Sequence, residues 1–375
     1  MIHRFIENQV LQALKPRFVV CLFGARRVGK TYLLEKIKTD LKKKKILVVE
    51  GQDLSVQEKL SSQRIEILKN FVGNNDFLFI DEAQSIPNIG VNLKLIADAI
   101  PVSVLVTGSS AFDLKNKIGE PLVGRSLFLN LFPISQLELS SKENFLQTSE
   151  RLEERLIFGG YPDVITADSK ISKIAVLENL RDSYLLKDIL MLDNLKDSIF
   201  VFNLLRQIAF QIGHDISHTE LAQNLNSNPR TIQRYLELLE KTFILFSLRG
   251  FSRNLRKEYT KTPRYYFWDN GVRNVLISNF NELNVRDDVG QLWENYCVVE
   301  RIKKNKYKLN SANYFFWRTY DQKEIDLIEE RNGKLYGYEM KFGKPNVKKP
   351  VEFLETYSGS QFQIINKENY LDFIT

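Results

Sequence analysis

The eight residues from 24 to 31, GARRVGKT, have the types and spacing of a phosphate-binding loop. The glycines let such a loop curl so that its N–H groups, with the positive end of the next helix, surround phosphate oxygens. Lys30 would neutralise the β- and γ-phosphates, and the Thr31 hydroxyl would contact Mg²⁺. The expected nucleotide is ATP, bound by Gly24, Ala25, Arg26, Arg27, Val28, Gly29, Lys30 and Thr31.

A carboxylate pair follows a second apolar stretch, since residues 77–80 end in Asp81 and Glu82. A carboxylate at the end of a parallel strand beside the loop would support Mg²⁺ together with Thr31, and the adjacent Glu82 would orient the attacking water. Lys30, Asp81 and Glu82 are therefore candidate catalytic residues. The alternative is a flexible glycine turn and an exposed acidic corner, which the apolar strands before both motifs disfavour.

Polar residues also follow the apolar stretch 102–106, at positions 107–110. Because ligands bind at the carboxyl ends of parallel strands, Ser109 or a neighbour could contact the γ-phosphate. An ordinary strand-to-loop turn explains any single one of these residues equally well.

A different chemistry is suggested near the C-terminus, where Asp326 is followed by Glu339 and Lys341. Alternating side chains place Glu339 and Lys341 on one face of a strand. If Asp326 lies on the neighbouring strand, two carboxylates and an ammonium converge, as in a magnesium-dependent nuclease that activates water for attack on a phosphodiester. A bare Asp and Glu-x-Lys also arise easily on solvated strands, so catalytic competence stays open.

A third group of residues suits nucleic acid. Residues 219–225 and 230–236 predict two short helices around a tight turn, and apolar runs near 243–246 and 265–268 could supply the hairpin of a winged helix. The second helix would expose Arg230, Gln233 and Arg234. The hairpin carries Arg249, Arg253, Arg256, Lys257, Lys261 and Arg264. These side chains suit a DNA groove and its phosphates; the alternative is a winged helix used for protein contacts.

The elements that must position these residues alternate between strands and helices over the first 134 residues. Strands are expected at 18–23, 46–49, 77–80, 102–106 and 126–131, with helices between them. This alternation predicts right-handed crossovers and a parallel sheet of the α/β class. Residues 135–198 read as helical, and 292–302, 314–318, 324–328 and 336–342 as a helix and three strands.

Composition limits the class of protein. The 375 residues carry a net charge of +7, which favours an acidic partner such as DNA without requiring one. Cys21 and Cys297 are too few and too distant for a disulfide framework or metal cluster, so reduced thiols in a cytoplasmic protein are expected. Polar residues interrupt any signal-peptide core at the N-terminus, and no apolar run reaches membrane-spanning length; no membrane partner is expected.

The loop, the stretch FLFIDEAQ, the turn TGSS and the pair Gly124-Arg125 resemble an AAA+ P-loop ATPase core. More narrowly, the chain resembles bacterial and archaeal AAA+ proteins in which a winged helix and a restriction-endonuclease-like domain follow that core. The resemblance implies an ATPase core at 1–134, a helical lid at 135–198, a winged helix at 199–270 and a nuclease-like domain at 271–375.

The resemblance also implies residue roles. Arg125 would act as an arginine finger or sensor, and a structural ion pair is its alternative. Glu294 matches the acidic residue in the first helix of the restriction-endonuclease core, while Ile325 replaces the proline that usually precedes the Asp. Gly159-Gly160-Tyr161-Pro162, Tyr184 and Asp188 recur in the narrower AAA+ family named above. AAA+ proteins in general often form rings, so the resemblance also implies a homo-oligomer.

Three functions remain open from the sequence. The first is an ATP-hydrolysing protein that binds or remodels DNA. The second is a nucleotide-gated regulatory or binding module with a catalytically silent nuclease-like domain. The third is an active ATP-dependent nuclease.

Overall fold

A computed structural model describes the chain except for residues 1, 110–121, 186–197, 253–261, 320 and 344–348. The fold is α/β, and it divides into two compact units. The first comprises residues 1–132 with 241–243, and the second comprises 133–240 with 244–375. None of the helices in the described ranges has the length and apolar character needed to span a membrane.

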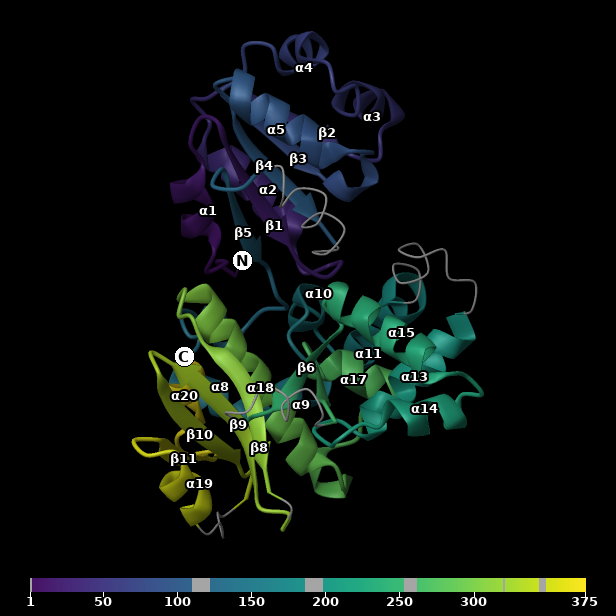
Figure 1. Cartoon of the computed structure of the whole chain (residues 1–375), viewed down its shortest axis with the longest axis vertical. Coiled ribbons are helices and arrows are strands. Elements are labelled where there is room, and N and C mark those ends of the chain that lie inside the picture. The colour runs from purple at the N-terminus through teal and green to yellow at the C-terminus, as the bar shows by residue number, and fades with distance from the viewer. Residues whose placement is uncertain (1, 110–121, 186–197, 253–261, 320, 344–348) are drawn as a thin grey trace. The chain divides into compact units, whose positions relative to one another are not determined.

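The N-terminal unit is built on one parallel sheet (Figure 1). Its strands are β1 (Phe18–Phe23), β2 (Ile46–Glu50), β3 (Phe77–Asp81), β4 (Ser103–Gly108) and β5 (Ser126–Asn130), in the order β2-β3-β4-β1-β5. Every pairing is parallel, as the alternation of strands and helices predicts. β1 and β4 are buried almost without a break, because a parallel sheet is covered on both faces.

Helices connect these strands. They are α1 (Glu7–Ala13), α2 (Lys30–Asp40), α3 (Leu54–Leu60), α4 (Ile65–Val72), the 3-10 turn η1 (Ala83–Ser85) and α5 (Ile89–Ala99). The predicted phosphate loop joins β1 to α2, and Asp81 is the last residue of β3. Both therefore lie at the carboxyl edge of the sheet, where ligands of such folds bind.

The second unit begins with short helices, as predicted for residues 135–198. They are α7 (Gln136–Leu139), α8 (Phe145–Glu150), α9 (Leu152–Phe158), α10 (Pro162–Ile165), α11 (Lys170–Leu180), the π-helical turn η2 (Arg181–Leu185) and then α13 (Ser198–Phe210). Asn274 Nδ2 donates to the carbonyls of Leu156 and Ile157 at 3.2 and 2.8 Å. This segment thus packs with C-terminal helices, a partner that its sequence does not predict.

The predicted helix pair is present as α14 (His218–Asn224) and α15 (Pro229–Lys241). Ser217 caps the first by accepting from the Glu220 N–H at 3.3 Å. Asn228 accepts from the Thr231 N–H at 2.9 Å at the start of the second. Residues 241–243, at the end of α15, belong to the N-terminal unit. There the Phe243 ring packs edge-on against Phe132.

A six-stranded mixed sheet completes the second unit. Its strands are β6 (Leu245–Gly250), β7 (Arg264–Phe267), β8 (Asn313–Arg318), β9 (Glu324–Arg331), β10 (Lys334–Met340) and β11 (Gln361–Ile365), in the order β11-β10-β9-β8-β6-β7. Helices α17 (Asn270–Leu276), η3 (Leu283–Val285), α18 (Val289–Tyr307), α19 (Val351–Thr356) and α20 (Tyr370–Ile374) accompany it.

The β6–β7 hairpin is antiparallel, as predicted for a wing. However, β6 also pairs in parallel with β8, aligning Arg249 with Phe315. The hairpin is therefore continuous with the C-terminal sheet. A domain boundary near residue 270, placed from sequence, cuts between elements that share one hydrogen-bonded sheet.

Candidate functional site

The phosphate loop has the backbone shape that its glycines allow. Gly29 adopts φ 97°, a region that side chains disfavour. A Cβ on Gly24 would lie 2.1 Å from the Leu131 carbonyl oxygen, so only glycine fits there. The Lys30 ammonium donates to the carbonyls of Gly24 and Ala25, each at 3.0 Å. The cation is thus already held within the loop, where phosphate oxygens could replace the carbonyls.

Asp81 and Thr31 come together as the sequence predicts. The Thr31 hydroxyl donates to Asp81 Oδ2 at 2.6 Å. The other oxygen, Oδ1, accepts from the Thr107 hydroxyl at the end of β4. Asp81 is buried, and its two oxygens accept from the first turn of α2 and from β4. A hydroxyl and a carboxylate oxygen are the hard ligands that Mg²⁺ takes alongside retained waters.

Glu82 shares Thr107 with Asp81 and has further contacts of its own. Its backbone lies in the left-handed region at φ 49°, which is uncommon outside glycine. Its N–H donates to Thr107 Oγ1 at 3.1 Å. Gln84 Nε2 donates both to the Glu82 carboxylate and to Ser109 Oγ, the latter at 3.2 Å. Ser109, a candidate phosphate contact, is therefore linked to the candidate catalytic carboxylate through one amide.

A third carboxylate at this edge was not predicted. Glu50 ends β2 directly beside Asp81 in the sheet register. Partial burial, followed by the charges of Asp81 and Glu82, raises the pKa of Glu50 above its ordinary value. A Cβ on Gly51 would lie 2.5 Å from the Glu82 carbonyl oxygen, so glycine permits this close approach of the two strand ends.

Arg125 does not reach the loop of its own chain. It precedes β5, and the Val19 N–H at the start of β1 donates to its carbonyl at 3.0 Å. The loop follows the other end of β1, about 15 Å away at the usual rise per strand residue. The half-exposed Arg125 side chain pairs instead with Asp98, which is the structural ion pair that the sequence left as the alternative.

In the second unit, the predicted nuclease-like residues lie together. Lys341 Nζ lies 2.7 Å from Glu339 Oε1, and the Met340 N–H donates to Asp326 Oδ2 at 2.7 Å. Both carboxylates are buried. Burial, followed by the charges of Glu294 and Glu339, raises the pKa of Asp326 well above its usual range. The second oxygen of Glu339, Oε2, is buried without a hydrogen-bond partner among the described residues.

Glu294 on α18 belongs to the same cluster. Its charge contributes to the raised pKa of both Asp326 and Tyr266. Tyr266 of β7 donates its hydroxyl proton to Glu294 Oε1 at 2.7 Å. Burial raises the pKa of Glu294 to about 7, against the opposing effect of that hydrogen bond. Within the described residues, no three His, Cys, Asp or Glu side chains are arranged to hold a metal ion.

The basic residues predicted for DNA contact divide into three sets. Arg230, Gln233 and Arg234 are exposed on α15, and Arg249 is exposed on β6. Arg253, Arg256, Lys257 and Lys261 lie outside the described residues. The prediction that Arg264 is exposed for DNA contact is wrong. Arg264 is buried, and its guanidinium donates to Asp215 at 2.9 Å and to Glu324 at 2.6 Å.

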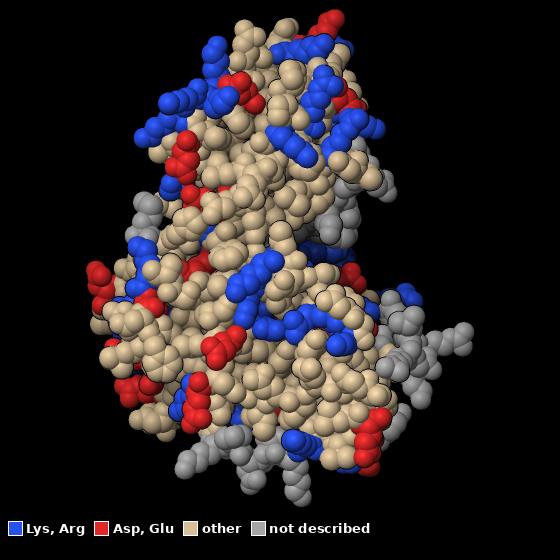
Figure 2. Space-filling view, turned by 90° about the vertical axis from the view of Figure 1, so that its left-hand side faces the viewer, with Lys and Arg blue, Asp and Glu red and all other residues tan. Residues whose placement is uncertain are grey.

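A groove of about 470 Å³ runs between α15 and the hairpin. Its titratable lining is mixed, with Glu237 and Glu240 opposing Arg249. Figure 2 draws a different face, the left-hand side of Figure 1, on which basic and acidic side chains are interspersed. Contact with DNA phosphates would therefore rest on the first turns of α15, around Arg230 and Arg234, rather than on this groove.

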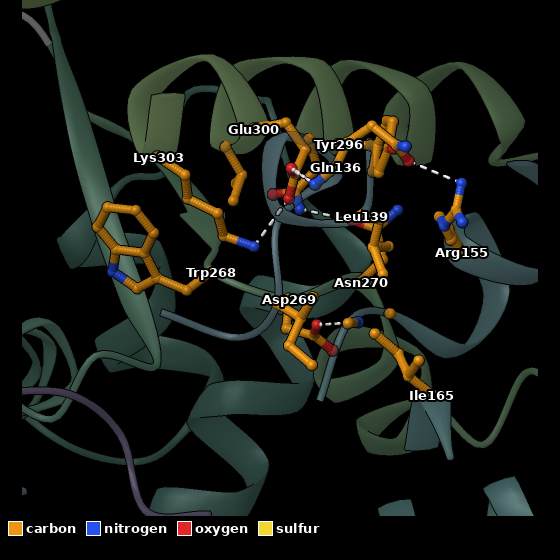
Figure 3. Close-up of a pocket in the computed structure, with 15 residues that line it drawn as sticks. Gln136, Leu139, Arg155, Ile165, Trp268, Asp269, Asn270, Tyr296, Glu300 and Lys303 are labelled. Atoms are coloured by element: carbon orange, nitrogen blue, oxygen red, sulfur yellow. Dashed lines mark hydrogen bonds and ion pairs between the residues drawn. The ribbon is translucent and has the colours of Figure 1, made fainter. Parts of the chain in front are cut away.

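A buried polar cluster, drawn in Figure 3, occupies the junction of α7, α9, α17 and α18. Lys303 Nζ donates to Glu300 Oε1 at 2.8 Å, and the other Glu300 oxygen accepts from the Gln136 N–H at 2.6 Å. Arg155 donates to the Gln136 side chain at 2.7 Å. Burial raises the pKa of Asp269 to about 6, although the Lys303 charge opposes this. These groups satisfy one another, which indicates a structural junction.

This cluster explains the Gly-Gly-Tyr-Pro motif. The Gly160 N–H donates to Asp269 Oδ2 at 2.6 Å, and a Cβ on Gly159 would lie 2.1 Å from Oδ1. Gly159 also adopts φ 75°. A Cβ on Gly160 would meet the Ile134 carbonyl oxygen at 2.4 Å. The paired glycines thus admit a buried carboxylate between two segments far apart in sequence.

Besides Glu50, three residues of these sites make contacts that the sequence did not predict. Gln84 lies in the quoted stretch FLFIDEAQ, and its spacing of two from Glu82 was the available signal. Thr107 was read as one of the polar residues 107–110 that could contact the γ-phosphate or form a turn, and its hydrogen bond to Asp81 was not predicted. Tyr266 lies in the aromatic run 265–268. The sequence predicts that such a residue packs in a strand, but it does not show that its hydroxyl also donates to a carboxylate.

Three family models match successive parts of the chain. Residues 16–140 match an AAA domain. Residues 149–283 and 289–370 match two domains of unknown function, DUF8612 and DUF4143.

Full-length relatives are distant. An uncharacterized protein of Haemophilus influenzae is 24% identical over 368 residues, covering 90% of this chain and 86% of the relative. One of Methanocaldococcus jannaschii is 25% identical over 350 residues, covering 88% and 75%.

Among solved structures, a RuvB mutant of Thermotoga maritima aligns with a TM-score of 0.32 and 19% identity, covering 66% of this chain and 90% of that one. DnaA from Aquifex aeolicus, bound to AMPPCP, aligns with a TM-score of 0.27 and 12% identity, covering 63% and 86%.

The family match covers the phosphate loop, Asp81, Glu82 and all five strands of the parallel sheet. Residues 16–140 are therefore similar to an AAA domain, and the matched range contains the whole phosphate-loop site.

Proposed function

We propose that this protein binds ATP with Mg²⁺ at the phosphate loop, hydrolyses it, and couples hydrolysis to the binding or remodelling of DNA. The observation that carries the proposal is the 2.6 Å contact between Thr31 Oγ1 and Asp81 Oδ2. It joins the last residue of the loop to the last residue of β3, which is the pair that a magnesium-dependent nucleotide site requires.

Each residue then has a definite task. Thr31 and Asp81 would hold Mg²⁺, which when bound neutralises charge on the phosphate oxygens. Lys30 exchanges its carbonyl partners for phosphate oxygens. Glu82 orients the attacking water and accepts its proton, and Gln84 fixes the direction of that carboxylate.

The proposed domain plan is an ATPase core at 1–134, a lid at 135–198, a winged helix at 199–270 and a nuclease-like domain at 271–375. DNA contact would come from the exposed Arg230, Gln233 and Arg234, because arginine on a helix can reach both base edges and phosphates. Arg253, Arg256 and Lys257, outside the described residues, are proposed as further DNA contacts. A homo-oligomer would let Arg125 reach the nucleotide of a neighbouring subunit.

The test is phosphate release from ATP and Mg²⁺, with and without double-stranded DNA, by the full chain and by Lys30→Ala. The proposal predicts release that DNA changes severalfold and that Lys30→Ala abolishes. Equal release by both proteins, or none by either, would overturn the ATPase. Release that DNA leaves unchanged would overturn the coupling alone.

A second candidate function is cleavage of DNA by the C-terminal cluster. The buried Glu339 Oε2 without a hydrogen-bond partner, beside Asp326 and Lys341, favours it, because such an oxygen is available to a divalent cation. DNA cutting that requires Mg²⁺ and disappears in Asp326→Ala and Lys341→Ala would support a nuclease. Intact DNA with normal ATP hydrolysis would instead indicate a silent domain in a nucleotide-gated module.

A further inference from the structure

A residue far from the phosphate loop in sequence contacts it directly. Arg4 precedes α1, is 4% exposed, and donates from Nη1 to the Val28 carbonyl at 2.5 Å. Its other terminal nitrogen, Nη2, donates to the Phe132 carbonyl at 2.6 Å. One buried guanidinium therefore joins the loop to the segment that follows β5. Charged donors make the stronger hydrogen bonds in proteins.

The Val28 carbonyl matters because of the peptide that it belongs to. In a trans peptide, the carbonyl and the next N–H point in opposite directions. Fixing the Val28 oxygen toward Arg4 therefore fixes the Gly29 N–H away from Arg4. Gly29 is at φ 97°, a conformation that the chain leaves readily when unsupported. Arg4 thus sets the direction of one N–H that a phosphate-binding loop presents to its ligand.

The segment that contains Phe132 is itself held against β1. The neighbouring Leu131 N–H donates to the Phe23 carbonyl at 2.6 Å, extending the pairing of β5 with β1. The Leu131 carbonyl packs so closely on Gly24 that no Cβ fits between them. The beginning of the loop is therefore held by Leu131 directly, and its end is held to Phe132 through Arg4.

We propose that Arg4 is a positioning residue for the nucleotide: it holds the phosphate loop in its binding conformation before ATP arrives. This inference rests on the proposed ATP binding. Arg4 contacts the loop backbone and its contribution is preorganisation, so its loss reduces nucleotide affinity by requiring the loop to be ordered on binding.

The test compares ATP and ADP affinity, by titration calorimetry with Mg²⁺, for the full chain and for Arg4→Gln and Arg4→Lys. Thermal unfolding without nucleotide is recorded for each. Arg273→Gln is the matched control, since Arg273 is also buried and donates to the Ala209 carbonyl at 2.8 Å, but in the second unit. Arg4→Gln is expected to bind both nucleotides at least tenfold more weakly, with Arg4→Lys between it and the wild type.

Arg273→Gln should lower the unfolding temperature and leave nucleotide affinity within twofold. Wild-type affinity in a folded Arg4→Gln would overturn the inference. If Arg4→Gln does not fold, Arg4→Lys decides, and affinity equal to the wild type would overturn it. Failure of the wild type to bind ATP would overturn the proposed function itself, which is a distinguishable result.

Discussion

The Tyr266 hydroxyl donates a hydrogen bond to Glu294 Oε1 at 2.7 Å, joining β7 to α18. Tyr266 belongs to the hairpin that the sequence assigns to a winged helix, and Glu294 to the helix that it assigns to a nuclease-like domain. The two parts therefore share a buried contact next to the carboxylate cluster.

Replacing Glu294 tests the electrostatics of this cluster. Its pKa rises from 4.5 to about 7 on folding, chiefly through burial. The folded state therefore keeps the proton to higher pH than the unfolded state, so wild-type stability falls as pH rises from about 4.5 to about 7. Glu294→Gln keeps an acceptor for Tyr266 and has no charge to desolvate.

The stability of Glu294→Gln relative to wild type is expected to increase across that interval by about 3 kcal/mol and to level off above it. Urea unfolding at several pH values measures the difference. Glu368→Gln, at an exposed position, serves as the control. A Glu294→Gln difference that does not change with pH would contradict the raised pKa.

Gly159→Ala should destabilise the second unit by about 2 kcal/mol or more, because a Cβ would lie 2.1 Å from Asp269 Oδ1 and φ is 75°. Gly290→Ala, at a helical position with open space, should be neutral or stabilise by up to about 1 kcal/mol. Thermal unfolding of both variants measures the contrast. Equal stabilities would refute the packing explanation of the Gly-Gly-Tyr-Pro motif.

The hydroxyl of Thr31 should be required for magnesium-dependent hydrolysis. Thr31→Ala is expected to lower kcat by about tenfold or more, because both the cation contact and the bond to Asp81 are lost. Thr31→Ser keeps the hydroxyl and most of the activity. Thr39→Ala, in the same helix but bonded only locally to the Glu35 carbonyl, is the control. Full activity of Thr31→Ala would contradict the assignment.

Arg230 and Arg234 should supply DNA affinity. Replacing each with alanine is expected to weaken binding of double-stranded DNA and to reduce the salt dependence of log K by about 1 per phosphate contact removed. Lys334→Ala, on an exposed strand end of the C-terminal sheet, should change neither quantity. Fluorescence anisotropy at several salt concentrations measures both. Unchanged binding in both arginine variants would favour a protein-contact role for α15.

The N-terminal unit could be predicted from sequence because its signals are local. The apolar strand before Gly24 and the carboxylates after residues 77–80 each fall within a few residues of the element that positions them. The parallel edge then brings Thr31 to Asp81 without further information. The convergence of Asp326, Glu339 and Lys341 followed for the same reason, since alternation along neighbouring strands fixes which side chains share a face.

The remainder depends on contacts between distant segments. The contact of Gly159 with Asp269 and the pairing of β6 with β8 join segments that are far apart in the sequence. Hydrophobic periodicity reports only on local structure, so it does not predict which distant segments meet. Arg264 was misplaced since a basic residue in a hairpin is usually exposed, whereas here two carboxylates compensate its burial.

The most direct test of the ATPase separates binding from hydrolysis in Glu82→Gln, a change that preserves side-chain size and removes the proton acceptor. ATP affinity and phosphate release are measured together in the presence of Mg²⁺. The proposed site predicts wild-type affinity with release reduced by about a hundredfold or more. Release at the wild-type rate from Glu82→Gln would contradict it.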